Sequence, residues 1–159
     1  MTIFRRFLVM TVLFFWQGGF VFFSGVVVPI GREEIGKDQS LITSRVSYYI
    51  NLAGAVAVAP LLWDVFAPDP SLRRRRLRAM LWLILMLTLL AQVYLYYQLL
   101  AMLPDIMNNN YPPSFSLEHR AYLWISTAQL AAAIGYMVTM LLAWRAQDHV
   151  EGHAAAVAD

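Results

Sequence analysis

Four amide side chains interrupt apolar stretches of the sequence and are the first candidates for chemistry. They are Gln17, Asn51, Gln92 and Gln129. Polar groups are costly inside lipid, so each of them needs a partner or a task there. If the four converge, their oxygens could hold a small ligand or a cation stripped of water. The alternative is hydrogen bonding between helices, which the lack of an accompanying permanent charge favours.

Asp64 is the only acid inside a predicted membrane span, one helical turn from its end and close in sequence to a run of arginines. A proton or cation relay would need a second ionisable group deeper in the membrane, and the sequence offers none. An ion pair at the membrane interface is therefore the favoured interpretation.

The cysteine and histidine content of the sequence gives little support for metal binding or thiol chemistry. The chain has no cysteine, which excludes disulfides, thiolate metal sites and thiol catalysis. His119, His149 and His153 lie outside the predicted spans, so a bis-histidine haem would need ligands from a partner chain. The helical spacing of His149 and His153 is interpreted as part of a solvated tail. The sequence predicts no metal site and no catalytic residue, and it names no cofactor.

The densest charge feature is the block Arg73, Arg74, Arg75 and Arg76, with Arg78 just beyond it. Arginines beside a membrane attract anionic lipid headgroups by about 1 kcal/mol each. The same residues could serve only to fix topology, since both effects have one electrostatic origin. The net charge of +2 does not indicate nucleic acid as a partner.

The elements that must position these residues are long apolar helices. Of 159 residues, 60% are hydrophobic, well above the roughly 45–50% of soluble domains. About 20 apolar residues cross a hydrocarbon core. The sequence predicts an all-α integral membrane four-helix bundle over residues 1–146, followed by a flexible cytoplasmic tail, 147–159. The four expected spans are 7–30, 48–67, 80–103 and 121–144.

Basic residues predict the orientation. Eight of the twelve lie at the amino terminus, in the second loop or at the carboxyl end, so the positive-inside rule places both termini in the cytoplasm. Pro60 is expected to kink the second span. The third loop, 105–120, is rich in proline and asparagine and is expected to lack secondary structure.

Packing motifs are clearer than chemical ones. Small residues recur every four positions in the fourth span, at Thr127, Ala131, Gly135, Thr139 and Ala143. Such a stripe lets another helix backbone approach closely. Gly18 and Gly25, seven apart in the first span, offer a shorter counterpart. These motifs favour association with other transmembrane helices, in a self-oligomer or a hetero-complex.

The first two spans also carry a resemblance. The segments Trp16-Gln17-Gly18-Gly19-Phe20, Val28-Pro29-Ile30-Gly31 and Asn51-Leu52-Ala53-Gly54-Ala55 resemble a family of small uncharacterised four-span bacterial membrane proteins, distantly similar to the copper-resistance D type. The resemblance implies a compact four-helix module in the bacterial cytoplasmic (inner) membrane. Copper activity is not carried over, because the spans lack histidine and cysteine.

Two functions remain open at this point. The first is a non-catalytic membrane subunit or scaffold that packs against other transmembrane helices in a larger assembly. The second is a small transporter, channel or hydrophobic-ligand carrier that uses the amides. An enzyme is the weakest hypothesis, since Glu33, Glu34, Glu118 and His119 form no recognisable motif on the predicted outer face.

Overall fold

The computed structural model describes residues 2–158, with the side chains of residues 3–150, and it is helical throughout apart from short turns. The predicted all-α fold is confirmed. Three helical stretches are long and apolar enough to cross a membrane: Ile3–Val65, Leu72–Ala101 and Phe115–Val150. We predicted four spans. The first two are joined here into one stretch because the turn between them, residues 36–38, is itself helical.

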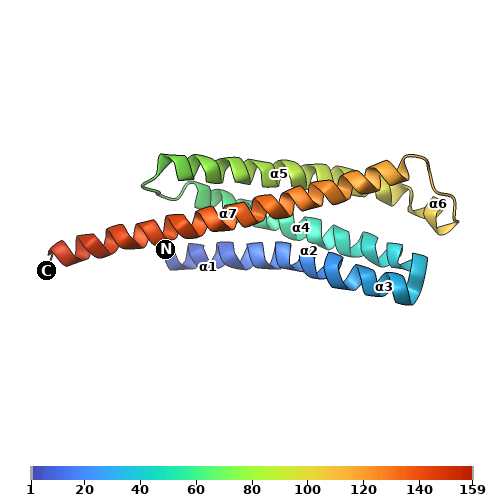
Figure 1. Cartoon of the computed structure of the whole chain (residues 1–159), viewed down its shortest axis with the longest axis horizontal. Helices are drawn as coiled ribbons and strands as arrows, with labels where there is room; N and C mark the ends of the chain where they lie inside the picture. The colour runs from blue at the N-terminus through green and yellow to red at the C-terminus, as the bar shows by residue number, and fades with distance from the viewer. Residues whose placement is uncertain (1, 159) are drawn as a thin grey trace.

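The first stretch reverses direction at Gly36. The backbone there has φ +59° and ψ −126°, a conformation that glycine adopts readily and other residues do not. Before it the chain forms one rod with two π-helical turns: α1 (Thr2–Leu13), η1 (Phe14–Gly18), α2 (Gly19–Phe22), η2 (Phe23–Val27) and α3 (Val28–Ile35). After the short η3 (Gly36–Asp38), the second rod, α4 (Gln39–Val65), runs back alongside it (Figure 1).

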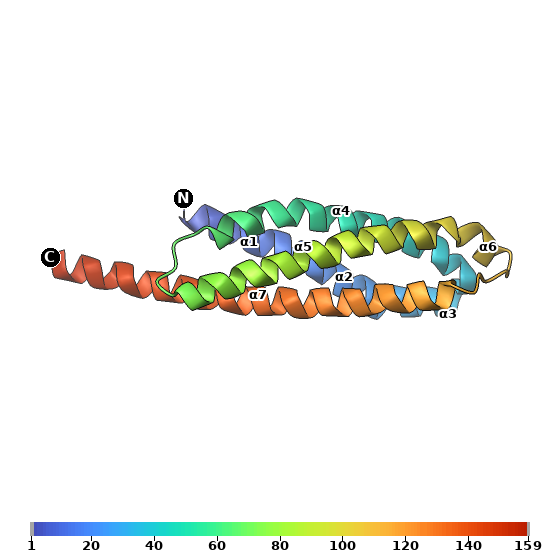
Figure 2. The same ribbon diagram turned by 90° about the horizontal axis from the view of Figure 1, so that it is seen from above.

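The other two rods are α5 (Leu72–Ala101) and α7 (Phe115–Ala158), with the short α6 (Leu103–Met107) between them. At 1.5 Å per residue, α5 is about 45 Å long and α7 about 66 Å. Figure 2 shows α7 continuing well past the bundle at the end where the amino terminus lies. We call this the basic end, since it holds Arg5, Arg6, residues 73–78 and Arg145 (Figure 1).

Two segments differ from our predictions. The third loop is not free of secondary structure, because α6 lies at its start and α7 begins at Phe115. The turn at Gly36 is tied to it, since Lys37 Nζ donates to the Met107 carbonyl at 3.2 Å. The carboxyl tail continues α7 as a helix to Ala158 instead of fraying. Asp159 lies outside the described residues. At Pro60, α4 remains one helix.

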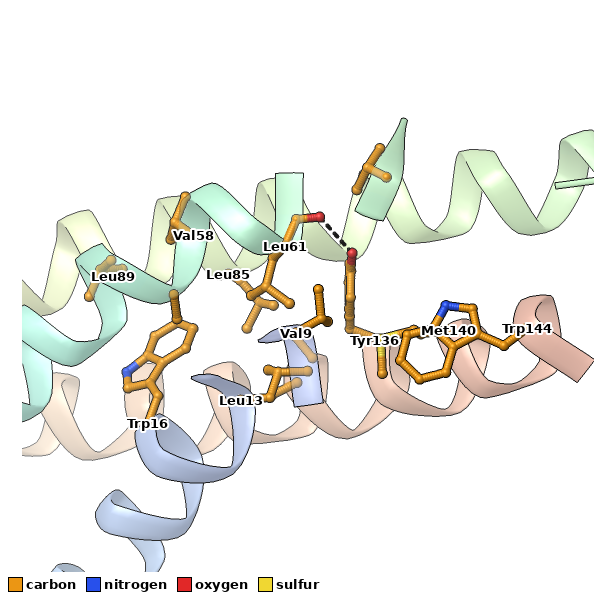
Figure 3. Close-up of a cluster of buried hydrophobic side chains, with 14 residues drawn as sticks. Val9, Leu13, Trp16, Val58, Leu61, Leu85, Leu89, Tyr136, Met140 and Trp144 are labelled. Atoms are coloured by element: carbon orange, nitrogen blue, oxygen red, sulfur yellow. Dashed lines mark hydrogen bonds between the residues drawn. The ribbon is translucent and has the colours of Figure 1, made fainter. Parts of the chain in front are cut away.

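The apolar core lies between the rods on the basic side of their midpoint. It includes Val9 and Leu13 from α1, Leu61 from α4, Leu85 from α5 and Met140 from α7, all nearly or fully buried (Figure 3). Most of the buried neutral polar residues lie toward the opposite end: Ser47, Asn51, Gln92, Ser126 and Gln129. The core is thus bounded by an ionic layer at one end and by neutral polar groups at the other.

Candidate functional site: a buried charge cluster

The site begins with the way α5 starts. Ser71 caps the helix, its hydroxyl accepting from the Arg74 backbone N–H, and its own N–H donates to Asp69 Oδ1 at 2.8 Å. Arg74 and Arg78 are four residues apart and therefore share one face of the helix. Both reach the Asp69 carboxylate, at 2.8 Å from Arg74 and 3.2 Å from Arg78. Asp69 thus fixes the register of α5 against the turn before it.

Arg78 also reaches the acid inside α4. Its Nη1 lies 3.1 Å from Asp64 Oδ2 and 3.2 Å from the Asp64 carbonyl oxygen. Neither side chain is exposed. On the other side of the carboxylate, Arg5 Nε from α1 lies 3.6 Å from Asp64 Oδ1. Asp64 is therefore held between arginines of two different rods.

The fourth rod supplies two neutral donors. The Tyr136 hydroxyl lies 2.8 Å from the Leu61 carbonyl oxygen and 3.3 Å from Asp64 Oδ2, and Figure 3 draws the first of these contacts. Trp144 Nε1 donates to Asp64 Oδ1 at 3.3 Å. We call Arg5, Asp64, Asp69, Arg74, Arg78, Tyr136 and Trp144 the charge cluster. It joins all four rods at the basic end.

In the charge cluster, buried charges of opposite sign compensate one another between the rods. A carboxylate moved out of water costs several kcal/mol unless partners compensate it. Asp64 has two arginines and two neutral donors around it, and its charge is compensated. Burial by itself would raise the pKa of Asp69, but the hydrogen bond from Arg74 and the charges of Arg74 and Arg78 lower it overall. Two buried donors of the cluster, Arg5 Nε and Arg78 Nε, have no hydrogen-bond partner among the described residues.

The favoured interpretation of Asp64 as half of an ion pair agrees with these contacts, but its partners lie outside the arginine run. Arg78 is the basic residue that reaches furthest into the apolar stretch, and that position was the one available signal. Arg5, Tyr136 and Trp144 are 59 to 80 positions away in the sequence. Only the depth and rotation of the rods bring them to Asp64, which is why sequence reasoning missed them.

The four predicted amides are all buried, but no hydrogen bond between described residues joins one of them to another. Gln92 Nε2 on α5 donates to the Ser126 hydroxyl on α7 at 3.0 Å, and Gln129 Nε2 lies 3.4 Å from the Thr88 hydroxyl. These two amides link α5 with α7, as the packing alternative expected. Gln17 and Asn51 behave differently, since neither amide has a hydrogen-bond partner among the described residues.

Beside these two amides the first rod packs against α4 through the Trp16 indole, which lies on Gly54. A Cβ on Gly54 would lie 2.6 Å from the Trp16 indole, so only glycine admits the ring there. Figure 3 shows the indole nitrogen pointing away from Val9 and Leu13. Trp16 and Gln17 lie in the π-helical turn η1, a backbone form that often marks functional sites. The indole nitrogen also has no partner among the described residues.

The arginine block is divided between two tasks. Arg74 is committed to Asp69, so it does not face headgroups freely as we predicted for the whole block. Arg73, Arg75 and Arg76 are exposed. Arg73 and Arg76, together with Leu77 and Met80, line an open groove of about 370 Å³ on α5. Arg73 and Arg76 therefore place charge beside apolar side chains, and a headgroup contact of the block stays a prediction.

The small-residue stripe of α7 does not lie on one face. Thr127 and Ala131 are exposed, Gly135 is half-buried, and Thr139 and Ala143 are buried. Steps of four overshoot the 3.6-residue turn, so the stripe rotates around the helix. At Gly135 its neighbour is Leu81 of α5, 3.5 Å from where a Cβ would lie.

Gly18 and Gly25 of the first rod pack against no other rod among the described residues. Gly18 is half-buried and would meet only the ring of Phe14 in its own rod. Gly25 is exposed, and no atom lies within 4 Å of where its Cβ would be. The first rod therefore does not use these glycines to pack against another rod of the same chain.

Among residues 3–150, no three histidine, aspartate or glutamate side chains gather in a way that could hold a metal ion. Compared with known proteins, the chain matches no protein-family model, no curated protein and no solved structure. The resemblance of the first two spans to the copper-resistance D type stays a prediction.

Proposed function

We propose that all four rods cross the bacterial inner membrane, with the basic end and both termini in the cytoplasm. The three long apolar stretches and the reversal at Gly36 support this placement. Exposed arginines at one end and exposed phenylalanines along the first rod, among them Phe7, Phe14 and Phe22, fit an interface and a lipid-facing surface.

Within that membrane the protein acts as a non-catalytic subunit or scaffold that packs against other transmembrane helices. One observation carries this proposal: small residues face outward on several rods. Ala131 on α7 and Gly25 on the first rod are both exposed. In lipid, small residues at a helix surface let a second backbone come close. The ionisable groups buried between the rods support the same view, because they bind one another.

The test is purification of the tagged protein in mild detergent, with mass spectrometry of what co-elutes and a measurement of its oligomeric state. Ala131→Leu and Gly25→Leu should each reduce the amount of partner, or of self-oligomer, because a large side chain keeps the second backbone away. Val138→Leu is the matched control, since Val138 is also exposed on α7 but already carries a large side chain. A wild-type protein that elutes as a lone monomer would overturn the proposal.

A small transporter or hydrophobic-ligand carrier is the second candidate. The specific observation in its favour is the pair of buried amides, Gln17 and Asn51, whose oxygens and nitrogens have no partner among the described residues. A transport site would lose flux or ligand binding on Gln17→Leu while the fold persists. A scaffold would keep its partners through the same change.

A further inference from the structure

A second open groove lies at the basic end, where α1 meets the end of α7 that leaves the bundle. It has a volume of about 410 Å³ and is lined by Arg6, Leu141, Trp144, Arg145, Asp148 and His149. Its residues come from two rods, unlike those of the groove on α5. The charge cluster lies behind it, since Trp144 also donates to Asp64.

The charge in this groove is unevenly compensated. Arg6 is paired with Asp148, with Nη2 and Oδ1 2.8 Å apart, and its guanidinium lies 5.3 Å from the centre of the Trp144 ring. Arg145 is exposed and makes no ion pair with another side chain among residues 3–150. His149 is exposed beside it. One cation thus remains unbalanced, with a further donor next to it.

The apolar side of the groove faces along the bundle. Leu141 is 45% exposed and lies four residues before Arg145, one turn nearer the middle of α7. Charged groups therefore stand at the end of the groove and a leucine below them. That order matches a phospholipid at a membrane surface, with its phosphate outside and an acyl chain inside.

We propose that this groove binds one anionic phospholipid. The phosphate accepts hydrogen bonds from Arg145 and His149 and approaches Arg6, while one acyl chain lies along Leu141. Basic pockets between transmembrane helices on the cytoplasmic side bind anionic headgroups in this way. The inference rests on the membrane placement proposed above, but not on any partner protein.

The bound lipid would connect two rods. Arg6 belongs to α1, and Arg145 with His149 belongs to α7, so one phosphate contacts both. Within the chain the two rods already meet here through Arg6 and Asp148. The lipid would add a second contact at the same level, outside the charge cluster.

The test is native mass spectrometry of the whole protein, released from detergent after addition of phosphatidylglycerol or phosphatidylcholine with identical acyl chains. We expect retention of phosphatidylglycerol over phosphatidylcholine. Arg145→Gln should weaken that retention about fivefold, the equivalent of 1 kcal/mol. His149→Gln should weaken it as well. Arg75→Gln is the matched control, since Arg75 is exposed at the same end but lines neither groove.

Each other outcome has a defined meaning. Equal losses for Arg145→Gln and Arg75→Gln would overturn the site in favour of general surface attraction. Displacement of the lipid by millimolar inorganic phosphate would show a free phosphate site and would also overturn it. Alkaline extraction of cell membranes tests the placement separately. A protein released by alkali would contradict the proposed function, whereas one that stays in the membrane without lipid preference would contradict only this inference.

Discussion

The guanidinium of Arg78 on α5 lies 3.1 Å from the carboxylate of Asp64 on α4, and neither side chain is exposed to solvent. Each of the two residues also reaches another element, Arg78 at Asp69 and Asp64 at Arg5 of α1. A buried pair of this kind is costly to leave half made, because the remaining charge keeps its desolvation penalty. It therefore specifies how α1, α4 and α5 meet.

Asp64→Asn should lower the free energy of unfolding by about 3–5 kcal/mol, the cost of removing one partner of a buried pair. The change keeps the size of the side chain but leaves Arg5 without its ion-pair partner and Arg78 with Asp69 alone. Denaturation with sodium dodecyl sulfate in mixed micelles, followed by circular dichroism, measures it. Asp105→Asn is the control, because Asp105 is exposed on α6. A loss no greater than that of the control would show that the pair does not hold the rods together.

Gly54→Ala and Gly19→Ala form a matched pair that tests the contact between Trp16 and α4. A Cβ on Gly54 would lie 2.6 to 2.8 Å from three indole atoms, whereas nothing lies within 4 Å of one on Gly19. We expect Gly54→Ala to destabilise by about 1–3 kcal/mol through overpacking. Gly19→Ala should be neutral or stabilise by up to about 1 kcal/mol, since alanine favours a helix.

The same unfolding assay reports both variants. Adding Trp16→Phe to Gly54→Ala should recover part of the loss, because the smaller ring leaves room for the new methyl group. Similar stabilities for the two single variants would mean that Trp16 does not rest on Gly54.

Gln92→Leu and Gln17→Leu should have opposite effects on stability. The Gln92 amide bonds the Ser126 hydroxyl across α5 and α7, so its loss should cost about 0.6–2 kcal/mol. The Gln17 amide has no described partner, so a leucine there should be neutral or stabilising. Measured ligand binding or flux completes the comparison. A large loss of stability from Gln17→Leu would show that its amide is bonded in the folded protein.

Acid should weaken the turn before α5 through Asp69. The pKa of its carboxyl is lower in the folded protein than its ordinary value of 3.8. The stabilising contribution is therefore complete above that value and is lost as the pH falls below it through the folded pKa. Unfolding measured between pH 7 and pH 2.5 should show this loss in the wild type. In Asp69→Asn the part of the loss due to Asp69 should be absent. If the free energies of unfolding of wild type and variant fall in parallel with pH, Asp69 makes no pH-dependent contribution.

The all-helical fold was predictable from the sequence because it follows from length and apolarity, which are local. The burial of Gln17, Asn51, Gln92 and Gln129 was predictable for the same reason. Their pairing was not. Gln92 meets Ser126 because α5 packs on α7, and no property of position 92 alone indicates that neighbour.

Two local patterns led to expectations that the three-dimensional structure modifies. Spacing by four predicts a continuous stripe along the fourth span, yet Ala131 is exposed and Ala143 is buried. The polar composition of residues 105–120 predicts an irregular loop, yet α6 reaches into it and its end accepts a hydrogen bond from Lys37. The first outcome follows from the 3.6-residue turn, which carries a four-residue spacing around the helix. The contact of α6 with Lys37 is tertiary and is not visible in a window of sequence.

Because the charge cluster joins the four rods at one end only, the two ends of the bundle should differ in how easily the rods separate. At the other end, Lys37 and neutral hydroxyl and amide groups supply the polar contacts between elements. Local separation of the helices by thermal motion should therefore begin at α3 and α6 and should not extend as far as Asp64. Backbone amides near Gly36 should exchange hydrogen sooner than those near Leu61. Anything that enters between the rods would do so from the end remote from the charge cluster.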